Sequence, residues 1–178
     1  LIAAARGDAA GSRRAADDMT RWAAPRGARI AVQLAHHVRA LSAAGAGDHE
    51  SAYRAASAVS PAGVLTPYTP HALWVMPDLV QAAVHTGRHA EAADHVRAMR
   101  GADVAAISPR LALVSAGCAA MAAADDDAAV LYRQALAVPG AERWPFDLAR
   151  VHLAVRVRLH RRELLVDAAN APALDEDE

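Results

Sequence analysis

The nine histidines are the side chains of this chain best suited to bind a metal, but their spacing keeps them apart. His36 and His37 are adjacent and would point to different faces of a helix. His85 and His89 flank Gly87, so a turn would separate them. The sequence contains no HExxH motif and no Cys–His cluster, which are the spacings typical of zinc sites. We therefore expect no metal site, and we expect the histidines to be partly exposed polar residues.

Other groups with chemical potential also favour structural roles. The run "DDD" at 125–127 places carboxylates at successive positions, which do not converge on a cation without a structured loop, so helix capping is expected. Cys118 lies in an Ala-rich run and is expected to be a small buried residue. A solvated basic helix face, rather than a phosphate site, is expected for the arginines near the C-terminus: Arg150, Arg156, Arg158, Arg161 and Arg162.

Enzymatic chemistry has no support in the sequence, because no nucleophile–base or paired-carboxylate arrangement stands out. All 19 basic residues are Arg, so the lysine of a phosphate-binding GxxxxGK[ST] loop cannot be present. No helix-turn-helix DNA reader is recognisable, and the net charge of −1 gives no field that attracts nucleic acid or membrane. We predict a protein that is not an enzyme, with no catalytic residues, no cofactor and no direct nucleic-acid partner.

The location of the protein follows from one cysteine and one apolar run. A single cysteine excludes an internal disulfide framework and fits a reducing cytoplasm. The run from Leu111 to Ala124 is too short and too rich in Ala and Gly to span a bilayer. We therefore expect a cytoplasmic protein that does not associate with membranes.

Composition indicates the elements that must position these groups. Hydrophobic residues make up 54% of the 178 residues, yet aromatics make up only 4%, so Ala supplies much of the apolar content. Alanine is the best helix former and allows helices to approach closely. An all-α fold is therefore predicted.

A repeat with a period near 40 residues runs through the chain. Gly7, Gly47 and Gly87 are 40 residues apart, and Ala124 stands in the equivalent place 37 residues later. Each ends an apolar helical run, and a second helical run follows after a few polar residues. Carboxylates stand where they could cap the second helix, at Asp8, Asp48 and Asp125. Helix–turn–helix hairpins at this period predict an α-solenoid, an α–α superhelix resembling tetratricopeptide repeats (TPR).

Proline and hydroxyl residues predict where further helices begin. Thr69–Pro70 and Ser108–Pro109 place a capping hydroxyl before Pro at the first helical position. Pro77 should kink its helix or mark its true start. The predicted helices cover residues 9–24, 28–44, 48–59, 70–85, 89–100, 109–123, 126–137 and 145–161.

Two groups of larger side chains are candidate contact residues. Trp144, Pro145 and Phe146 stand between charged residues, and we interpret them as a structural joint in which both rings pack beside Ala135 and Ala137. A ligand or partner groove is a second possibility in the array. Its candidate residues lie at or near the starts of first-of-pair helices: Tyr68, His71, Trp74 and Arg110. A core role for Trp74 is the alternative.

Three segments resemble the helical-repeat region of the large ATP-binding LuxR-family transcriptional regulators of actinobacteria. They are "VMPDLVQAAVHTGRHAEAADHVRAM", "ISPRLALVSAGCAAMAA" and "VLYRQALAVPGAERWPFDLARVHLA". The resemblance covers about residues 5–154, and the sequence departs from the family pattern after Ala154. It implies a TPR-like array over residues 1–163 and a divergent, poorly ordered acidic tail over 164–178.

The resemblance also implies a function. In the family, a signal-transduction NTPase domain precedes the array and a helix-turn-helix domain follows it. The chain would then be a non-catalytic arm that senses a signal or binds proteins, with those two domains, a peptide or a small inducer as partners. The alternative is a free-standing TPR-like interaction module from a truncated gene. Because "LIAAAR" at the start is typical of a helix end, we interpret the chain as cut from a longer protein and expect self-association through this apolar end.

Overall fold

Helices and turns make up the part of the chain that the structure describes. The computed structural model describes residues 1–170, with the side chains of 125, 126 and 161–170 excepted, and no strand occurs in this range. The helices are α1 (Ile2–Ala5), α2 (Ala9–Ala23), α3 (Arg29–Gly45), α4 (His49–Ser57), α5 (Pro70–His85), α6 (His89–Gly101), α7 (Val104–Ile107), α8 (Pro109–Ala122), α9 (Asp125–Leu136) and α10 (Pro145–Asn170), with 3-10 turns η1 (Ala24–Arg26) and η2 (Ala141–Arg143). The prediction of an all-α fold is confirmed.

Most helix ends lie within two residues of the predicted ones, and the exceptions are informative. Helix α5 continues through Pro77, which therefore does not mark its start. Helix α10 extends to Asn170, through the first residues of the expected 164–178 tail. Residues 171–178, on which the rest of that prediction falls, lie outside the described residues.

The repeated glycines form one kind of turn. Gly47 has φ +78°, its N–H donates to the Ala44 carbonyl at 3.1 Å, and the N–H of Asp48 donates to the Ala43 carbonyl at 3.0 Å. The equivalent bonds occur at Gly7 and Gly87. These bonds satisfy carbonyls at the helix end, and the left-handed conformation suits glycine. The fourth turn differs, because Ala124 is extended, with φ −63° and ψ 162°.

Capping groups behave largely as predicted. The carboxylates of Asp8 and Asp48 accept hydrogen bonds from the backbone N–H groups of Gly11 and Ser51, at 2.8 and 3.0 Å. Ser108 caps α8 by accepting from the N–H of Leu111 at 3.2 Å. Thr69 is the exception, because its hydroxyl accepts a hydrogen bond from Gln33 of α3 instead of capping α5.

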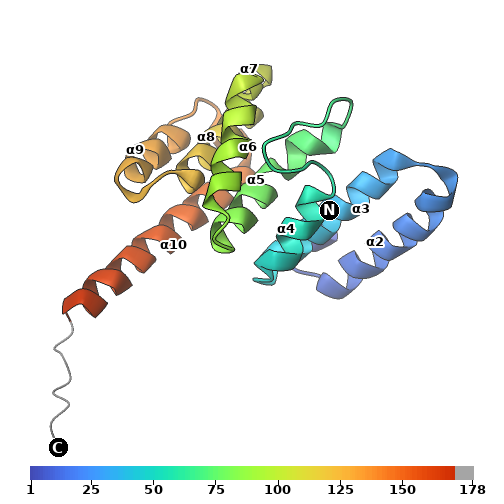
Figure 1. The fold of residues 1–178 in the computed structure, drawn as a ribbon, viewed down its shortest axis with the longest axis horizontal. Helices are drawn as coiled ribbons and strands as arrows, with labels where there is room; N and C mark the ends of the chain where they lie inside the picture. Colours follow the sequence, from blue (N-terminus) through green and yellow to red (C-terminus); the bar gives the residue numbers. More distant parts are fainter. Residues whose placement is uncertain (171–178) are drawn as a thin grey trace, which may run out of the picture.

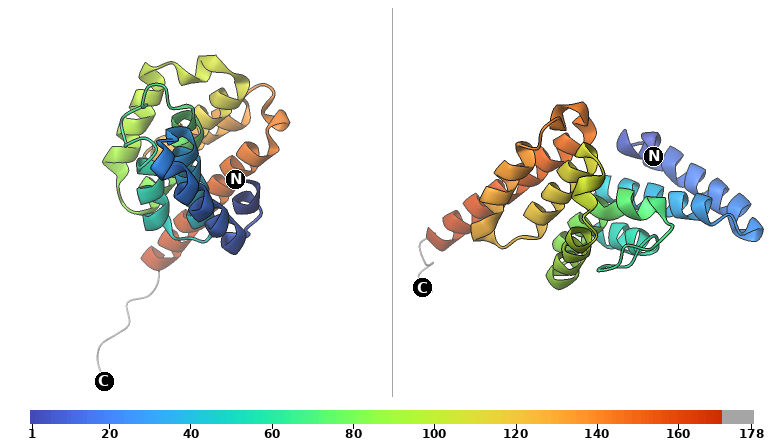
Figure 2. Two further views of the ribbon diagram at one scale, coloured as in Figure 1. Left: turned by 90° about the vertical axis from the view of Figure 1, so that its right-hand side faces the viewer. Right: turned by 90° about the horizontal axis from the view of Figure 1, so that it is seen from above.

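The helices alternate between two structural positions. We call α1, α3, α5, α8 and α10 the A helices, and α2, α4, α6 and α9 the B helices. Each A helix contacts the next A helix, and each B helix contacts the A helices before and after it. In Figure 1, the α5–α6 pair lies in the middle, with α2–α4 on one side and α8–α10 on the other. The view from above in Figure 2 shows these two sides diverging from the central pair.

Four hydrophobic clusters follow one another along this arrangement. The largest surrounds Met76, Val80 and Cys118, and joins α5, α6 and α8. A second joins α8, α9 and α10, and there a Cβ on Gly117 would approach Val151 Cγ2 to 2.9 Å. Gly117 therefore allows α10 to pack closely against α8, which brings charged side chains of α10 near those of α5.

Candidate functional site

A fully buried carboxylate lies where three A helices meet. Asp78 of α5 has no exposed surface. Its Oδ1 lies 2.9 Å from Arg150 Nη2 of α10, and its Oδ2 lies 3.4 Å from His37 Nε2 of α3. Arg150 also donates to Gln81 Oε1 at 2.9 Å. Because a buried carboxyl group is costly unless it is paired, these contacts offset the burial of Asp78 between helices from three hairpins.

A second ion pair joins α8 to α10 nearby. The Arg110 guanidinium donates from Nε to Asp147 Oδ2 at 2.7 Å and from Nη2 to Asp147 Oδ1 at 3.3 Å. Asp147 is buried and lies in the first turn of α10, where the helix end also favours a negative charge. Arg110, a predicted groove residue, is therefore engaged by a carboxylate within the molecule.

The other three predicted groove residues lie in or just before the first turns of α5, and His71 and Trp74 are in contact. His71 is buried and makes edge contacts with two rings, at centroid distances of 5.9 Å to His37 and 5.4 Å to Trp74. We call His37, His71 and Trp74 the aromatic row. Trp74 is 46% exposed, so one end of the row reaches solvent and the core alternative for this residue is wrong. Burial, followed by the neighbouring His37, lowers the pKa of His71 and favours its neutral ring.

Tyr68 extends this surface beyond the helix. Its side chain is fully exposed, and its φ of +55° lies in the left-handed region. A side chain in that region costs about 1–2 kcal/mol relative to right-handed geometry. The exposed rings of Tyr68 and Trp74 can each stack against apolar or planar groups.

The rest of this region contains a small cavity and a buried thiol. The cavity beside Asp147 and Arg150 has a volume of only about 20 Å³, enough for one water molecule. Burial raises the pKa of the Cys118 thiol to about 12, and Cys118 is fully buried as predicted. Among the described residues, no three His, Cys, Asp or Glu side chains are grouped in a way that could hold a metal ion.

The histidines are more buried than predicted. His37, His71 and His95 are buried, so the expectation of partly exposed histidines is wrong for all three. His95 has no hydrogen-bond partner on either ring nitrogen among the described residues, and burial lowers its pKa to about 4. His85 stacks on His49 with ring centroids 4.1 Å apart. The pairing of His37 was not predicted from the sequence, because its partner Asp78 lies in another helix.

The arginines of α10 also differ from the expected solvated face. Arg150 reaches Asp78, and Arg158 donates to carbonyl oxygens at the end of α8, the shortest distance being 2.8 Å to Ala123. Arg158 thereby satisfies helix-terminal carbonyls. Arg156 is exposed as predicted. The side chains of Arg161 and Arg162 lie outside the described residues.

The predicted aromatic joint is only partly correct. Pro145 begins α10, as predicted. The packing of the two rings is wrong, because Trp144 is 37% exposed and Phe146 is 45% exposed. Val151, rather than either ring, fills the space between α10 and α8. The partly exposed rings of Trp144 and Phe146 form apolar surface at the start of α10.

Comparisons with protein-family models, curated proteins and solved structures find no match to this chain. Among the described residues, none of the helices combines the length and apolar character that crossing a membrane requires.

Proposed function

We propose that this chain is a non-catalytic TPR-like array that serves as the signal-sensing or protein-interaction arm of a LuxR-type transcriptional regulator in the cytoplasm. The observation that carries the interaction role is the order of contacts, with each A helix against the next and each B helix between two A helices. Arrays built in this way present one extended surface formed by successive repeats. The sequence resemblance supplies the regulator context.

The aromatic row and Tyr68 are the proposed contact surface for a partner. Trp74 offers an exposed ring that buried His71 holds in place, and Tyr68 keeps a fully exposed ring despite an unfavourable backbone conformation. Unfavourable backbone geometry is often associated with functional positions. Aromatic side chains in such a setting contribute strongly to protein interfaces. The partner is the NTPase domain of the same regulator, and a peptide or small inducer competes with it.

A two-step experiment tests this proposal. The coding region around the chain is sequenced, and the proposal requires an in-frame Walker motif upstream and an in-frame helix-turn-helix domain downstream. The NTPase domain is then titrated with the chain by calorimetry. We expect Trp74→Ala to weaken binding at least tenfold, since a central aromatic contact contributes about 2 kcal/mol or more.

Trp144→Ala is the matched control, because Trp144 is similarly exposed but lies at the start of α10. It should bind like the parent chain. Equal losses from both substitutions would reject the aromatic row as the contact surface. Absence of the flanking domains from the reading frame would reject the regulator role and leave the free-standing interaction module.

A further inference from the structure

His71 links the exposed ring of Trp74 to the buried carboxylate of Asp78. Its ring centroid lies 5.4 Å from that of Trp74 and 5.9 Å from that of His37. His37 Nε2 in turn lies 3.4 Å from Asp78 Oδ2, and Asp78 Oδ1 lies 2.9 Å from Arg150 Nη2. The aromatic row is therefore connected by direct contacts to the junction of α3, α5 and α10.

The position of His71 suits only its neutral ring. The residue is 8% exposed, and its Nδ1 is buried without a hydrogen-bond partner among the described residues. A protonated imidazole carries an N–H on both nitrogens, so protonation would bury an N–H that has no acceptor. Burial, followed by the neighbouring His37, accordingly lowers the pKa of His71.

The groups around His71 do not offset a charge on its ring. His37 of α3 faces it, and Nδ1 of His37 is also buried without a hydrogen-bond partner in the described part of the chain. Beyond His37, the Asp78 carboxyl group is paired with Arg150. Helices α4, α6 and α8 bring no charged side chain into a described contact with His71, and Tyr68 before α5 is fully exposed. A proton on His71 therefore meets another imidazole rather than a carboxylate.

Pro77 provides a hinge between this histidine and the fixed part of α5. Proline has no N–H, so the Leu73 carbonyl lacks its helical hydrogen bond at this point, and helices bend most readily at such sites. His71 and Trp74 lie before the hinge, whereas Asp78 lies after it and is held by its contacts with other helices. The first turns of α5 can therefore tilt without breaking the Asp78 contacts.

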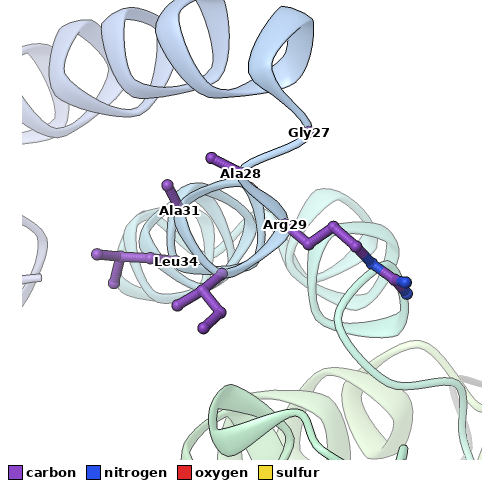
Figure 3. A pocket seen from close by; sticks show the side chains of 6 residues that line it. Gly27, Ala28, Arg29, Ala31 and Leu34 are labelled. Atoms are coloured by element: carbon purple, nitrogen blue, oxygen red, sulfur yellow. The ribbon is translucent and has the colours of Figure 1, made fainter.

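The beginning of α3 adds no competing response to pH. Figure 3 shows the side chains of Ala28, Ala31 and Leu34 at an open pocket on its first turns, with Arg29 extending away from them. An arginine stays charged over the range in which histidine titrates, and the other residues that line this pocket do not titrate.

We propose that protonation of His71 releases the first turns of α5, which pivot at Pro77 and carry Trp74 away from the aromatic row. In the released form both nitrogens of His71 can donate hydrogen bonds to water. Since this is regulation of the proposed contact surface, its consequence for the partner rests on the proposed function: the partner binds at neutral pH and dissociates in acid.

The direction of the pH effect follows from where the proton binds more tightly. The pKa of His71 is lower in the row than the ordinary histidine value of 6.5, so the released form takes up the proton more readily. Falling pH therefore favours release. For a single proton, the ratio of released to closed molecules rises by up to about tenfold per pH unit below 6.5.

Trp74 reports this movement when it is the only tryptophan. The chain has three tryptophans, so Trp22→Phe and Trp144→Phe together isolate it. Acrylamide quenching and the emission maximum are measured on this full chain without a partner, while far-UV circular dichroism follows its helix content. As the pH falls below 6.5, we expect quenching by acrylamide to rise at least twofold and the emission to move to longer wavelength, with a constant helical signal.

Three substitutions in this background assign the response. His71→Gln takes up no proton and should show no pH response, and His71→Phe replaces it if His71→Gln loses its helical signal. Pro77→Ala restores the missing N–H and should reduce the response at least twofold. His36→Gln is the matched control, because burial, followed by Arg39, lowers the pKa of His36 too, yet its ring makes no described contact with the aromatic row. It should respond like the parent.

Several results would overturn the proposal. They are an unchanged pH response in His71→Gln or His71→Phe, an undiminished response in Pro77→Ala, and a loss of emission intensity without greater access of acrylamide to Trp74. Loss of the helical signal in parallel with the change at Trp74 would also overturn it, because the whole chain would then be unfolding. No partner is present in these measurements, so failure of the NTPase domain to bind would count against the proposed function alone.

Discussion

His95 is a titratable residue buried without hydrogen-bond partners among the described residues. It has no exposed surface, and its pKa is lowered to about 4 by burial. The imidazole is therefore held neutral inside α6, whereas in the unfolded chain it takes up a proton near its ordinary pKa of 6.5. Nothing in the local pattern "EAADHVRAM" distinguishes this histidine from an exposed one.

The His95 pKa predicts acid sensitivity. Because the folded-state pKa is below the unfolded value, the unfolded chain binds more protons between pH 6.5 and 4, and stability falls as the pH falls through that window. At pH 4, the loss of folding stability that His95 causes is about 3 kcal/mol. When the His95→Leu variant is unfolded with denaturant across this pH range, its free energy of unfolding should fall less steeply than that of the parent chain. The exposed His152→Leu variant should follow the parent, and parallel curves for parent and His95→Leu would contradict the assignment.

At the scale of elements, local signals account for most of the fold. Glycines at a 40-residue spacing mark helix ends, and prolines mark the first positions of α5, α8 and α10. Both signals are local, because a few neighbouring residues determine the backbone geometry at each of these positions. The sequence therefore predicted most of the longer helices closely, whereas the short helices α1 and α7 were not predicted. It did not predict which side chains would meet between helices, because His37, Asp78 and Arg150 lie in different hairpins. The exposed rings of Trp144 and Phe146 were mispredicted for the same reason.

Two glycines in one turn provide a matched pair for testing the hairpin geometry. A Cβ on Gly45 or on Gly47 would meet no atom within 4 Å, so packing does not separate the two sites. Gly47 has φ +78° and Gly45 is helical. Gly47→Ala should therefore destabilise the chain by about 1–2 kcal/mol, and Gly45→Ala should stabilise it by about 0.5–1 kcal/mol. Thermal unfolding measures both, and shifts of the same sign would refute this description of the turn.

At the scale of the whole molecule, Asp78 connects helices that are far apart in the chain. Its contacts reach α3 on one side and α10 on the other, while α8 lies between α5 and α10 in the sequence of A helices. One buried carboxylate thus contacts both of the sides that diverge in Figure 2. Removing a partner of Asp78 should therefore lower the stability of more than one hairpin.

Arg150→Ala tests this connection. Removing one partner of a buried ion pair typically costs about 3–5 kcal/mol. We expect faster hydrogen exchange in both α5 and α10, with little change in α2. Arg21→Ala is the control, because the side chains of the Arg21–Asp18 pair are 75% and 70% exposed and such surface pairs contribute about 0–1 kcal/mol. A change confined to α10 would show that Asp78 does not couple the two sides.

The Asp78–Arg150 pair also bears on how such an array can change during evolution. Repeat proteins can lose or duplicate a unit because each unit contacts only its neighbours. Here α5 and α10 depend on each other across the α8–α9 hairpin, and Arg110 of α8 depends on Asp147 of α10. Deleting that hairpin would remove Arg110 and leave buried Asp147 without this partner, and duplicating it would place a further hairpin between Asp78 and Arg150. Helices α5 to α10 are therefore constrained to be inherited as one block, whereas the hairpins before them are freer to vary in number.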